Sequence, residues 1–346
     1  MNSSDNYNPT AVFTDVITIL YQYVDIPLYI VGNLGNLLSA VIFFQKSWRK
    51  NVCVFYCLIC LLVDMCYINS SMIANIFING FNVYLHYSNL ILCKLYNFTS
   101  FFLSTLKPTI LVFASIDRLL ISSQNVQTRL YSSRRLAYFS MSIGTTFLFI
   151  FFSHVLIKFN FIKTGPFTII CLYNLTDFYR DFVSLSMLTI NIILFSLMII
   201  LSIISFKNVH QIRSIPREKR QNIRKMHKKD FQLLRCLFVK NIVYIICSFP
   251  LVIQAIYGAV IKYQIQTIWI QAFKTFLFNF GVFVYNTHFC TNVFIYAIVS
   301  KAFRHHVKRM IYKLFNINIP LLQEEQQNEQ VERNKSIEIN VVDVNA

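Results

Sequence analysis

Seven long apolar stretches constrain the fold of this chain more than any other feature of its sequence. A helix needs about 20 mostly apolar residues to cross the hydrocarbon of a bilayer, and each stretch exceeds that length. The stretches cover residues 17–44, 52–79, 89–121, 136–158, 182–206, 231–261 and 268–299. The predicted fold class is therefore an all-α membrane protein, a bundle of seven transmembrane helices.

The composition favours a membrane protein over a soluble one. Only 14% of the 346 residues are charged and 55% are apolar, whereas about 25% of a soluble domain is charged. These values argue against a water-soluble enzyme and against a disordered chain. The net charge of +17 would suggest nucleic-acid binding in a soluble protein, but no nucleic-acid partner is expected for a chain this apolar.

The positions of the basic residues predict how the bundle is oriented. Of the 32 Lys and Arg residues, 24 lie in segments that a seven-helix topology places on one side, and six lie on the other. Cytoplasmic segments are enriched in Lys and Arg, so the N-terminus is expected outside the cell and the C-terminus inside, in the plasma membrane. The basic segments also attract anionic lipids of the inner leaflet. They are residues 45–51, 118–135, 207–235 and 300–346.

This topology divides the chain into three parts. Residues 1–16 form an extracellular tail, residues 17–315 the transmembrane domain, and residues 316–346 a flexible cytoplasmic tail rich in Gln, Glu and Asn. Asn2 and Asn174 each begin an acceptor triplet for N-glycosylation on the predicted outer side. Cys93 and Cys171 also map to that side, where disulfides form, and a bond between them would tie the third span to the second outer loop.

Ionisable residues inside the spans are the candidates for function, because charges in a bilayer are costly. Asp64 lies in the second span, and Lys107 lies in the middle of the third. Asp117 and Arg118 end that third span. Lys107 and Arg118 are 11 residues apart, about three helical turns, so they share one face of their helix. Lys240 also falls within a span, and the sequence assigns it no role.

Six motifs in this order resemble the rhodopsin-like class of G-protein-coupled receptors. The resemblance covers residues 17–315 and includes departures, with Leu119, Ser248 and Val293 in place of the family's Tyr, Trp and Pro. The motifs are Gly35-Asn36, Asp64 28 residues later, Cys93 25 residues before Arg118, Asp117-Arg118-Leu119, Cys247-Ser248-Phe249-Pro250 and Asn292-Val293-Phe294-Ile295-Tyr296. A basic stretch that opens with Phe303-Arg304 is similar to the family's eighth, membrane-surface helix.

The resemblance implies a receptor that binds an extracellular ligand and activates a heterotrimeric G protein. Arg118 would hold the resting state by pairing with Asp117 and with Asp230, an acid on the sixth helix. Alternatively, Asp230 is one acid in a basic, solvated loop. Pro250 would kink the sixth helix, and the set Asn36, Asp64, Asn292 and Tyr296 would form a polar core that couples the helices.

Lys107 departs from the family in an informative way. Relatives usually carry Ser at this position, beside the residue that corresponds to Asp64, and often bind sodium there. We hypothesise that the ammonium of Lys107 pairs with Asp64 and replaces the sodium ion. Alternatively, Lys107 points elsewhere, or the register of the helix differs. No cofactor is expected, and bound sodium is not expected either.

The ligand is less constrained than the class of protein. Ser100 stands where amine receptors of the family place Asp, which argues against a monoamine. The loop at 159–181 is long enough for a β-hairpin like that of peptide receptors, so a neuropeptide is the first hypothesis and a lipid or small chemosensory ligand the second. The candidate pocket residues on the outer half are Tyr96, Ser100, Ser104, Asn191, Gln254, Tyr257, Lys274 and Asn279.

Two other classes of protein remain as alternatives. A transporter or channel would use Asp64 and Lys107 as an ion path, but the sequence has neither an internal repeat nor a pair of Gly/Pro-broken spans. An intramembrane enzyme would need a His/Glu metal motif or a Ser/His/Asp arrangement, and none stands out. The chain is therefore not expected to be an enzyme.

Overall fold

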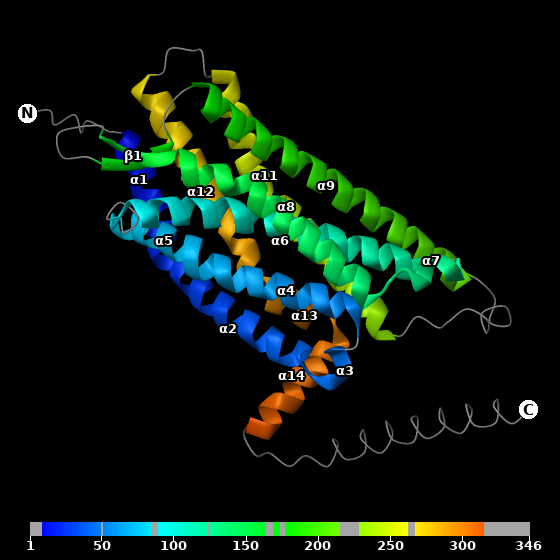
Figure 1. The fold of residues 1–346 in the computed structure, drawn as a ribbon. Coiled ribbons are helices and arrows are strands. Elements are labelled where there is room, and N and C mark those ends of the chain that lie inside the picture. The colour runs from blue at the N-terminus through cyan, green and yellow to red at the C-terminus, as the bar shows by residue number, and fades with distance from the viewer. Residues whose placement is uncertain are drawn as a thin grey trace, which may run out of the picture. The chain divides into compact units, whose positions relative to one another are not determined.

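The computed structural model contains seven helices that are long and apolar enough to cross a membrane, which confirms the predicted class (Figure 1). The structure describes residues 9–49, 51–84, 89–123, 125–163, 169–173, 177–214, 228–261 and 267–314. The candidate spans are Ala11–Phe43, Val52–Gly80, Leu90–Ser122, Arg134–Lys158, Asp181–Asn208, Phe231–Val260 and Ile268–Cys290.

The first span begins earlier than the sequence predicts. Residues up to 16 were expected to form a tail, but α1 (Pro9–Ile19) already begins at Pro9 and runs on through the π-helix η1 (Leu20–Asp25) into α2 (Ile26–Phe43). Proline suits the first position of a helix. The side chain of Phe13 packs against Trp269 and Phe276, with ring centroids 5.1 and 4.9 Å apart. This packing extends the helix beyond the apolar stretch that predicted it.

The remaining elements follow in chain order, and short segments join the spans. They are α3 (Lys46–Arg49), α4 (Val52–Tyr67), η2 (Ile68–Met72), α5 (Ile73–Asn75), η3 (Ile76–Gly80), α6 (Leu90–Ser122), α7 (Val126–Leu130), α8 (Arg134–Lys158), β1 (Phe159–Lys163), β2 (Ile169–Tyr173), α9 (Asp177–Ser214), α11 (Lys228–Val260), α12 (Ile268–Cys290), α13 (Asn292–Val299) and α14 (Lys301–Leu314).

Side-chain caps begin several of these helices. Asn51 accepts a hydrogen bond from the backbone N–H of Cys53 at 2.9 Å and begins α4. Asn89, Ser133 and Thr267 cap α6, α8 and α12 in the same way. Because such caps satisfy N–H groups that have no partner within the helix, these polar residues fix where each apolar helix starts.

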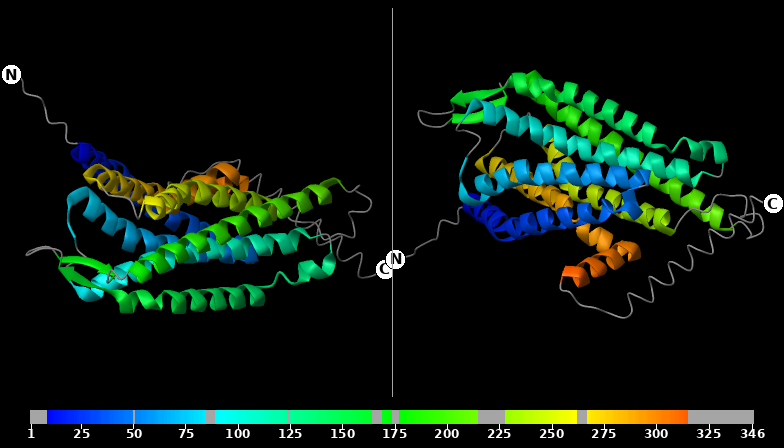
Figure 2. Two further views of the ribbon diagram at one scale, coloured as in Figure 1. Left: turned by 90° about the horizontal axis from the view of Figure 1, so that it is seen from above. Right: turned by 60° about the horizontal axis from the view of Figure 1, so that its bottom comes forward.

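Helix α6 lies at the centre of the bundle and contacts α4, α8, α9 and α11 (Figure 2). The bundle closes where α12 and α13 pack against α2. This closure depends on glycine, because a Cβ at Gly35 would lie 2.5 Å from Cγ1 of Val293, and one at Gly32 would lie 2.6 Å from the sulfur of Cys290. The two segments therefore approach too closely for any larger residue.

The seventh helix is interrupted at Thr291, between α12 and α13. The carbonyl of His288 accepts the Thr291 hydroxyl at 3.0 Å and the Lys107 ammonium at 3.2 Å. The carbonyl of Phe289 accepts the side-chain amides of Asn36 and Asn292. Side chains thus replace part of the backbone ladder at this turn.

The outer surfaces of the spans are apolar. Large side chains such as Phe147, Ile150, Ile193 and Ile203 are more than half exposed. In a soluble protein such surfaces would be unfavourable, whereas lipid tails cover them in a bilayer. The arrangement supports a multi-pass membrane protein.

Helix α14 belongs to a second unit, residues 302–346, and is described by itself. Its sequence alternates apolar residues at helical spacing with five basic residues. Helix α14 follows the seventh span; that it is the predicted eighth helix on a membrane surface stays a prediction. The predicted tail at 316–346 lies outside the described residues.

Candidate functional site

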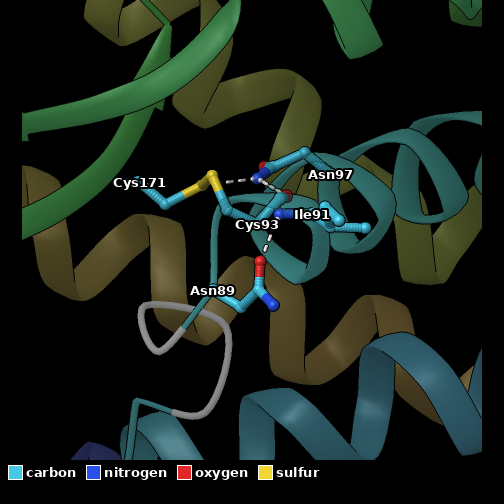
Figure 3. The surroundings of a disulfide bond; sticks show 5 residues. All are labelled: Asn89, Ile91, Cys93, Asn97 and Cys171. Atoms are coloured by element: carbon cyan, nitrogen blue, oxygen red, sulfur yellow. Dashed lines mark hydrogen bonds between the residues drawn. A yellow bond between two sulfur atoms is a disulfide. The ribbon is translucent and has the colours of Figure 1, made fainter.

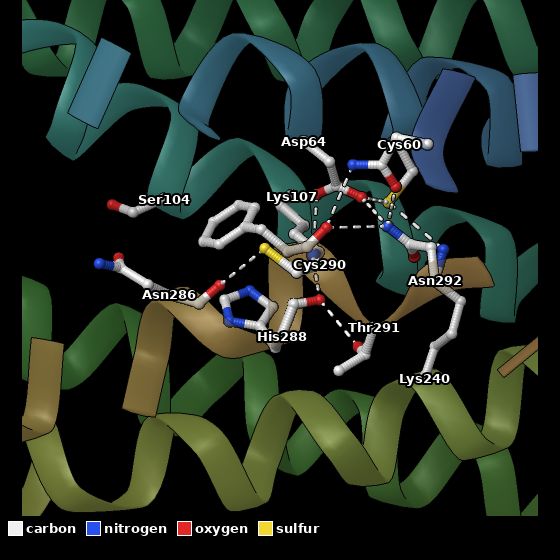
Figure 4. Close-up of polar contacts among 12 residues, drawn as sticks. Cys60, Asp64, Ser104, Lys107, Lys240, Asn286, His288, Cys290, Thr291 and Asn292 are labelled. Carbon is white, nitrogen blue, oxygen red and sulfur yellow. Dashed lines mark hydrogen bonds and ion pairs between the residues drawn. The ribbon is translucent and has the colours of Figure 1, made fainter. Parts of the chain in front are cut away.

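A buried ion pair between Lys107 and Asp64 lies at the centre of the bundle (Figure 4). The Lys107 Nζ is 2.8 Å from Oδ1 of Asp64, and the two side chains are 2% and 0% exposed. Lys107 comes from α6 and Asp64 from α4. The hypothesis that the ammonium pairs with this carboxylate is confirmed, and the alternative that Lys107 points elsewhere is wrong.

Asn292 connects this ion pair to the first helix. Its Nδ2 donates to Oδ2 of Asp64 at 2.6 Å and to Oδ1 of Asn36 at 2.9 Å. Asn36 in turn donates to the carbonyl of Phe289 at 3.2 Å, and the Lys107 ammonium lies 4.1 Å from the centre of the Phe289 ring. Residues of four spans thus converge on one cluster, as the resemblance predicted for a polar core.

Proline at position 108 places one more contact beside this cluster. Pro108 lies inside α6 and has no N–H, so the carbonyl of Ser104, four residues earlier, loses its helical donor. The hydroxyl of Tyr285 donates to that carbonyl at 3.0 Å. Pro108 therefore leaves a carbonyl of α6 free to bond to α12, next to the turn of α6 that carries Lys107.

Lys240 of α11 reaches the other side of the same cluster. Its Nζ donates to the hydroxyl of Tyr296 at 3.1 Å and lies 3.8 Å from the sulfur of Cys60. The side chain is 5% exposed. Cys60 Sγ is in turn 3.9 Å from Asp64, so the thiol lies between a carboxylate and an ammonium. The structure gives Lys240 a place that the sequence did not.

Arg118 is buried near one end of α6, and Cys93 lies near the other. We name the two ends of the bundle after these residues, the Arg118 end and the Cys93 end. The Nη2 of Arg118 lies 2.6 Å from Oδ2 of Asp117, and its Nε donates to the same oxygen at 3.1 Å. Ser132 donates to the other carboxylate oxygen at 2.5 Å. Arg118 also donates to Asn51, the cap of α4, at 3.3 Å. The predicted pair of Arg118 with Asp117 is present.

The predicted partner on the sixth helix is not tested. Asp230 falls in α11, but its side chain lies outside the described residues. Pro250 lies inside α11, which continues through it. A cavity of about 10 Å³ lies beside Arg118, between α6, α9 and α11. Above it, Asn241 donates to Ser115 at 3.2 Å and to Ser202 at 3.1 Å, so one amide joins the three helices that surround the cavity.

The Cys93 end carries the predicted disulfide and a β-hairpin. Cys93 and Cys171 are bonded, with Cα atoms 5.8 Å apart (Figure 3). Asn97 donates to the sulfur of Cys171 at 3.2 Å. Strands β1 and β2 pair antiparallel, with Phe161 opposite Cys171, which confirms the predicted hairpin. The disulfide therefore anchors the hairpin to the first turn of α6. Asn2 and Asn174 lie outside the described residues.

Several predicted pocket residues bond to neighbouring helices. Tyr96 donates to Asn75 at 2.9 Å. Ser100 shares a hydrogen bond of 2.7 Å with Ser71, and Asn191 accepts one from Tyr244 at 3.2 Å. These contacts tie α6 to the second span and α9 to α11.

The other predicted pocket residues are dispersed. Ser104 bonds to its own helix at the carbonyl of Phe101. Lys274 of α12 lies against Gly258 of α11. Gln254 and Tyr257 are half-buried on α11, and the backbone carbonyl of Asn279 accepts the hydroxyl of Tyr21 at 3.0 Å. That the set lines one pocket stays a prediction.

The sequence reasoning missed several buried polar residues, among them Asp25, Asn286 and His288. Asp25 is 0% exposed, and neither of its oxygens has a hydrogen-bond partner among the described residues. Asn286 accepts the hydroxyl of Tyr67 at 3.2 Å, and His288 bonds through Nδ1 to the carbonyl of Tyr285. Asp25 could have been found as an acid inside the first apolar stretch. Asn286 and His288 lie in α12, just before the interruption at Thr291.

The described residues contain no group of three His, Cys, Asp or Glu side chains that could hold a metal ion. The Lys107–Asp64 pair joins α6 to α4. Comparison with known proteins does not identify a family. No family model matches the chain, and no curated protein matches it significantly.

Proposed function

We propose that this chain is a rhodopsin-like G-protein-coupled receptor, which binds an extracellular ligand at the Cys93 end and activates a heterotrimeric G protein at the Arg118 end. The observation that carries the proposal is the Asp117–Arg118 pair, buried at the end of the same helix that holds Lys107 in the polar core. The order of the motifs along the chain supports the same function.

The coupling would pass through contacts that join the helices. Asn292 bonds to Asp64 and Asn36, so a shift of the seventh helix changes the centre of the bundle. Lys240 and Asn241 bind α11 to that centre and to the Arg118 end. An outward movement of α11 would break these contacts and widen the cavity beside Arg118 into a cleft for a G-protein helix. A ligand that favours this state shifts the population toward it.

A peptide is the favoured ligand. The β1–β2 hairpin, which the disulfide holds over the Cys93 end, supports a peptide because an extended segment can pair with exposed strand edges. The bonding of Tyr96, Ser100 and Asn191 between helices favours contact at the mouth of the bundle over a deep small-molecule pocket. A lipid or small chemosensory ligand is the second candidate.

The test is ligand-independent activation of co-expressed G proteins, read as nucleotide exchange in membranes. Arg118→Ala is expected to abolish the basal exchange, and Asp117→Asn to raise it, because the neutral amide holds Arg118 less strongly. Arg135→Ala is the matched control, since Arg135 is an exposed arginine at the same end. Two results together would favour a transporter instead: no basal exchange with any of the co-expressed G-protein subtypes, and ion or solute flux through the purified chain.

The predicted clamp has its own test. Asp230→Ala should raise basal exchange if Asp230 holds Arg118 in the resting state. Unchanged basal exchange at normal surface expression would leave Asp230 as a solvated loop residue.

A further inference from the structure

The polar core holds more positive than negative charge. Lys107 and Lys240 both end in it, with side chains 2% and 5% exposed, and Asp64 is its only carboxylate among the described residues. Both oxygens of that carboxylate are already engaged, one by Lys107 and one by Asn292. A buried ammonium without a counter-charge is strongly unfavourable in a membrane.

Lys240 is the ammonium that lacks a partner of opposite charge. Within the part of the chain that the structure describes, no carboxylate oxygen lies within 4.0 Å of its Nζ. Its contacts are the Tyr296 hydroxyl and the Cys60 sulfur, which are both neutral in their ordinary protonation states.

The other buried acids do not compensate this charge. Asp117 is paired with Arg118. Asp25 makes no ion pair among the described residues, and it lies 11 residues before Asn36 along a continuous helix, which corresponds to about 16 Å at a rise of 1.5 Å per residue. Asn36 marks the level of the polar core, so Asp25 lies far from Lys240.

A cavity beside Lys240 offers space for a counter-ion. It has a volume of about 10 Å³ and is lined by Lys107, Leu111, Lys240, Val243, His288, Thr291, Asn292 and Ile295. Such a volume holds one water-sized sphere. Each ammonium has three N–H donors, and only two of those of Lys240 are used by the contacts above. The flexible side chain of Lys240 can adjust to an occupant slightly larger than water.

We infer that this cavity binds a small monovalent anion, chloride being the abundant one, between the ammonium groups of Lys240 and Lys107. The anion completes the charge balance of the core and bonds to the free donor of Lys240. Bound there, it links α11 to α6 and the α12–α13 turn, so the site stabilises the folded bundle. This inference goes beyond the proposed function, and its test does not depend on signalling.

The test measures thermal unfolding of the purified full chain in lipid nanodiscs. Sodium gluconate is replaced stepwise by sodium chloride at constant sodium concentration and ionic strength. The unfolding midpoint is expected to rise with chloride and then saturate, because a ligand that binds only the folded state stabilises it in proportion to its occupancy. Lys240→Gln should lose this rise. Lys240→Arg keeps the charge and should retain it, as should the control Lys158→Gln, which removes an exposed lysine outside the core.

A second measurement locates the ion directly. A crystal grown in bromide should show anomalous scattering between Lys240 and Lys107. Density without an anomalous signal would identify a water and overturn the inference, as would a midpoint that ignores chloride or rises equally in Lys240→Gln. If a thiolate of Cys57 or Cys60 supplies the counter-charge instead, wild type ignores chloride and only Cys57→Ser or Cys60→Ser responds to it, which also overturns the inference.

Discussion

Replacing Lys107 by methionine tests whether the ion pair at the centre of the bundle holds the structure together. Methionine keeps most of the volume of lysine and removes only the charge and the donors. The variant leaves the carboxylate of Asp64 buried with one amide partner, Asn292. The carbonyl of His288 also loses one of its donors.

The expected magnitude follows from the geometry of the pair. At the observed separation of 2.8 Å, two unit charges attract by about 6 kcal/mol at an effective dielectric constant of about 20. Desolvating each ion costs several kcal/mol, so the net value of the pair is small. Removing one partner is different, because the remaining ion stays desolvated, and it destabilises by about 3–5 kcal/mol.

The assay is a double-mutant cycle read by thermal unfolding in nanodiscs. Lys107→Met and Asp64→Asn should each lower the unfolding midpoint by several degrees. The double variant should be markedly more stable than either single variant, with a coupling free energy of about 2–3 kcal/mol. Lys274→Met is the control for loss of a lysine outside the core. Additive losses in the double variant would refute the argument that these two charges depend on each other.

Three further changes follow from described contacts. Exchange of potassium for sodium should not alter the unfolding midpoint of the wild type, because the Lys107 ammonium already pairs with Asp64. Lys107→Ser should instead become stabilised by sodium, and a sodium-specific shift in the wild type would contradict this. Gly35→Ala should destabilise by about 1–3 kcal/mol through overpacking, while Gly258→Ala, with its nearest contact at 3.6 Å, should fold normally; equal unfolding midpoints for the two variants would contradict the close packing. Cys93→Ser and Cys171→Ser should each lose about 4–5 kcal/mol, as expected for closing a loop across 78 residues, and the double variant should lose no more than either one; additive losses would show that the cysteines act separately.

The sequence predicted the features that depend on length and local composition. Apolar stretches longer than a bilayer crossing can form only helices there, because every backbone polar group must be satisfied within the segment. The partner of Lys107 was predicted from the resemblance, which places position 107 beside the residue that corresponds to Asp64. An ammonium in a membrane also requires an acceptor. The hairpin at β1–β2 was predicted from loop length and the position of Cys171.

Other features could not be predicted because they depend on contacts between distant segments. The first helix starts at Pro9 because Phe13 meets aromatic rings of α12, which no local pattern encodes. The break at Thr291 arises because Lys107 and side-chain amides bind carbonyls of that turn. The predicted pocket is not tested as a single group. Three of its residues, Tyr96, Ser100 and Asn191, bond to a neighbouring helix, and which helix is adjacent is set by packing.

The sequence by itself determined that this chain spans a membrane seven times, because hydrophobic length leaves no other solution. It also identified most of the charges that lie inside the bundle, although it missed Asp25. Only the tertiary structure decided how those charges are paired, since distances between helices depend on close contacts such as that of Gly35 with Val293. Lys107 pairs with a carboxylate. Lys240, equally visible in the sequence, lies beside a cavity and contacts neutral groups such as the Tyr296 hydroxyl.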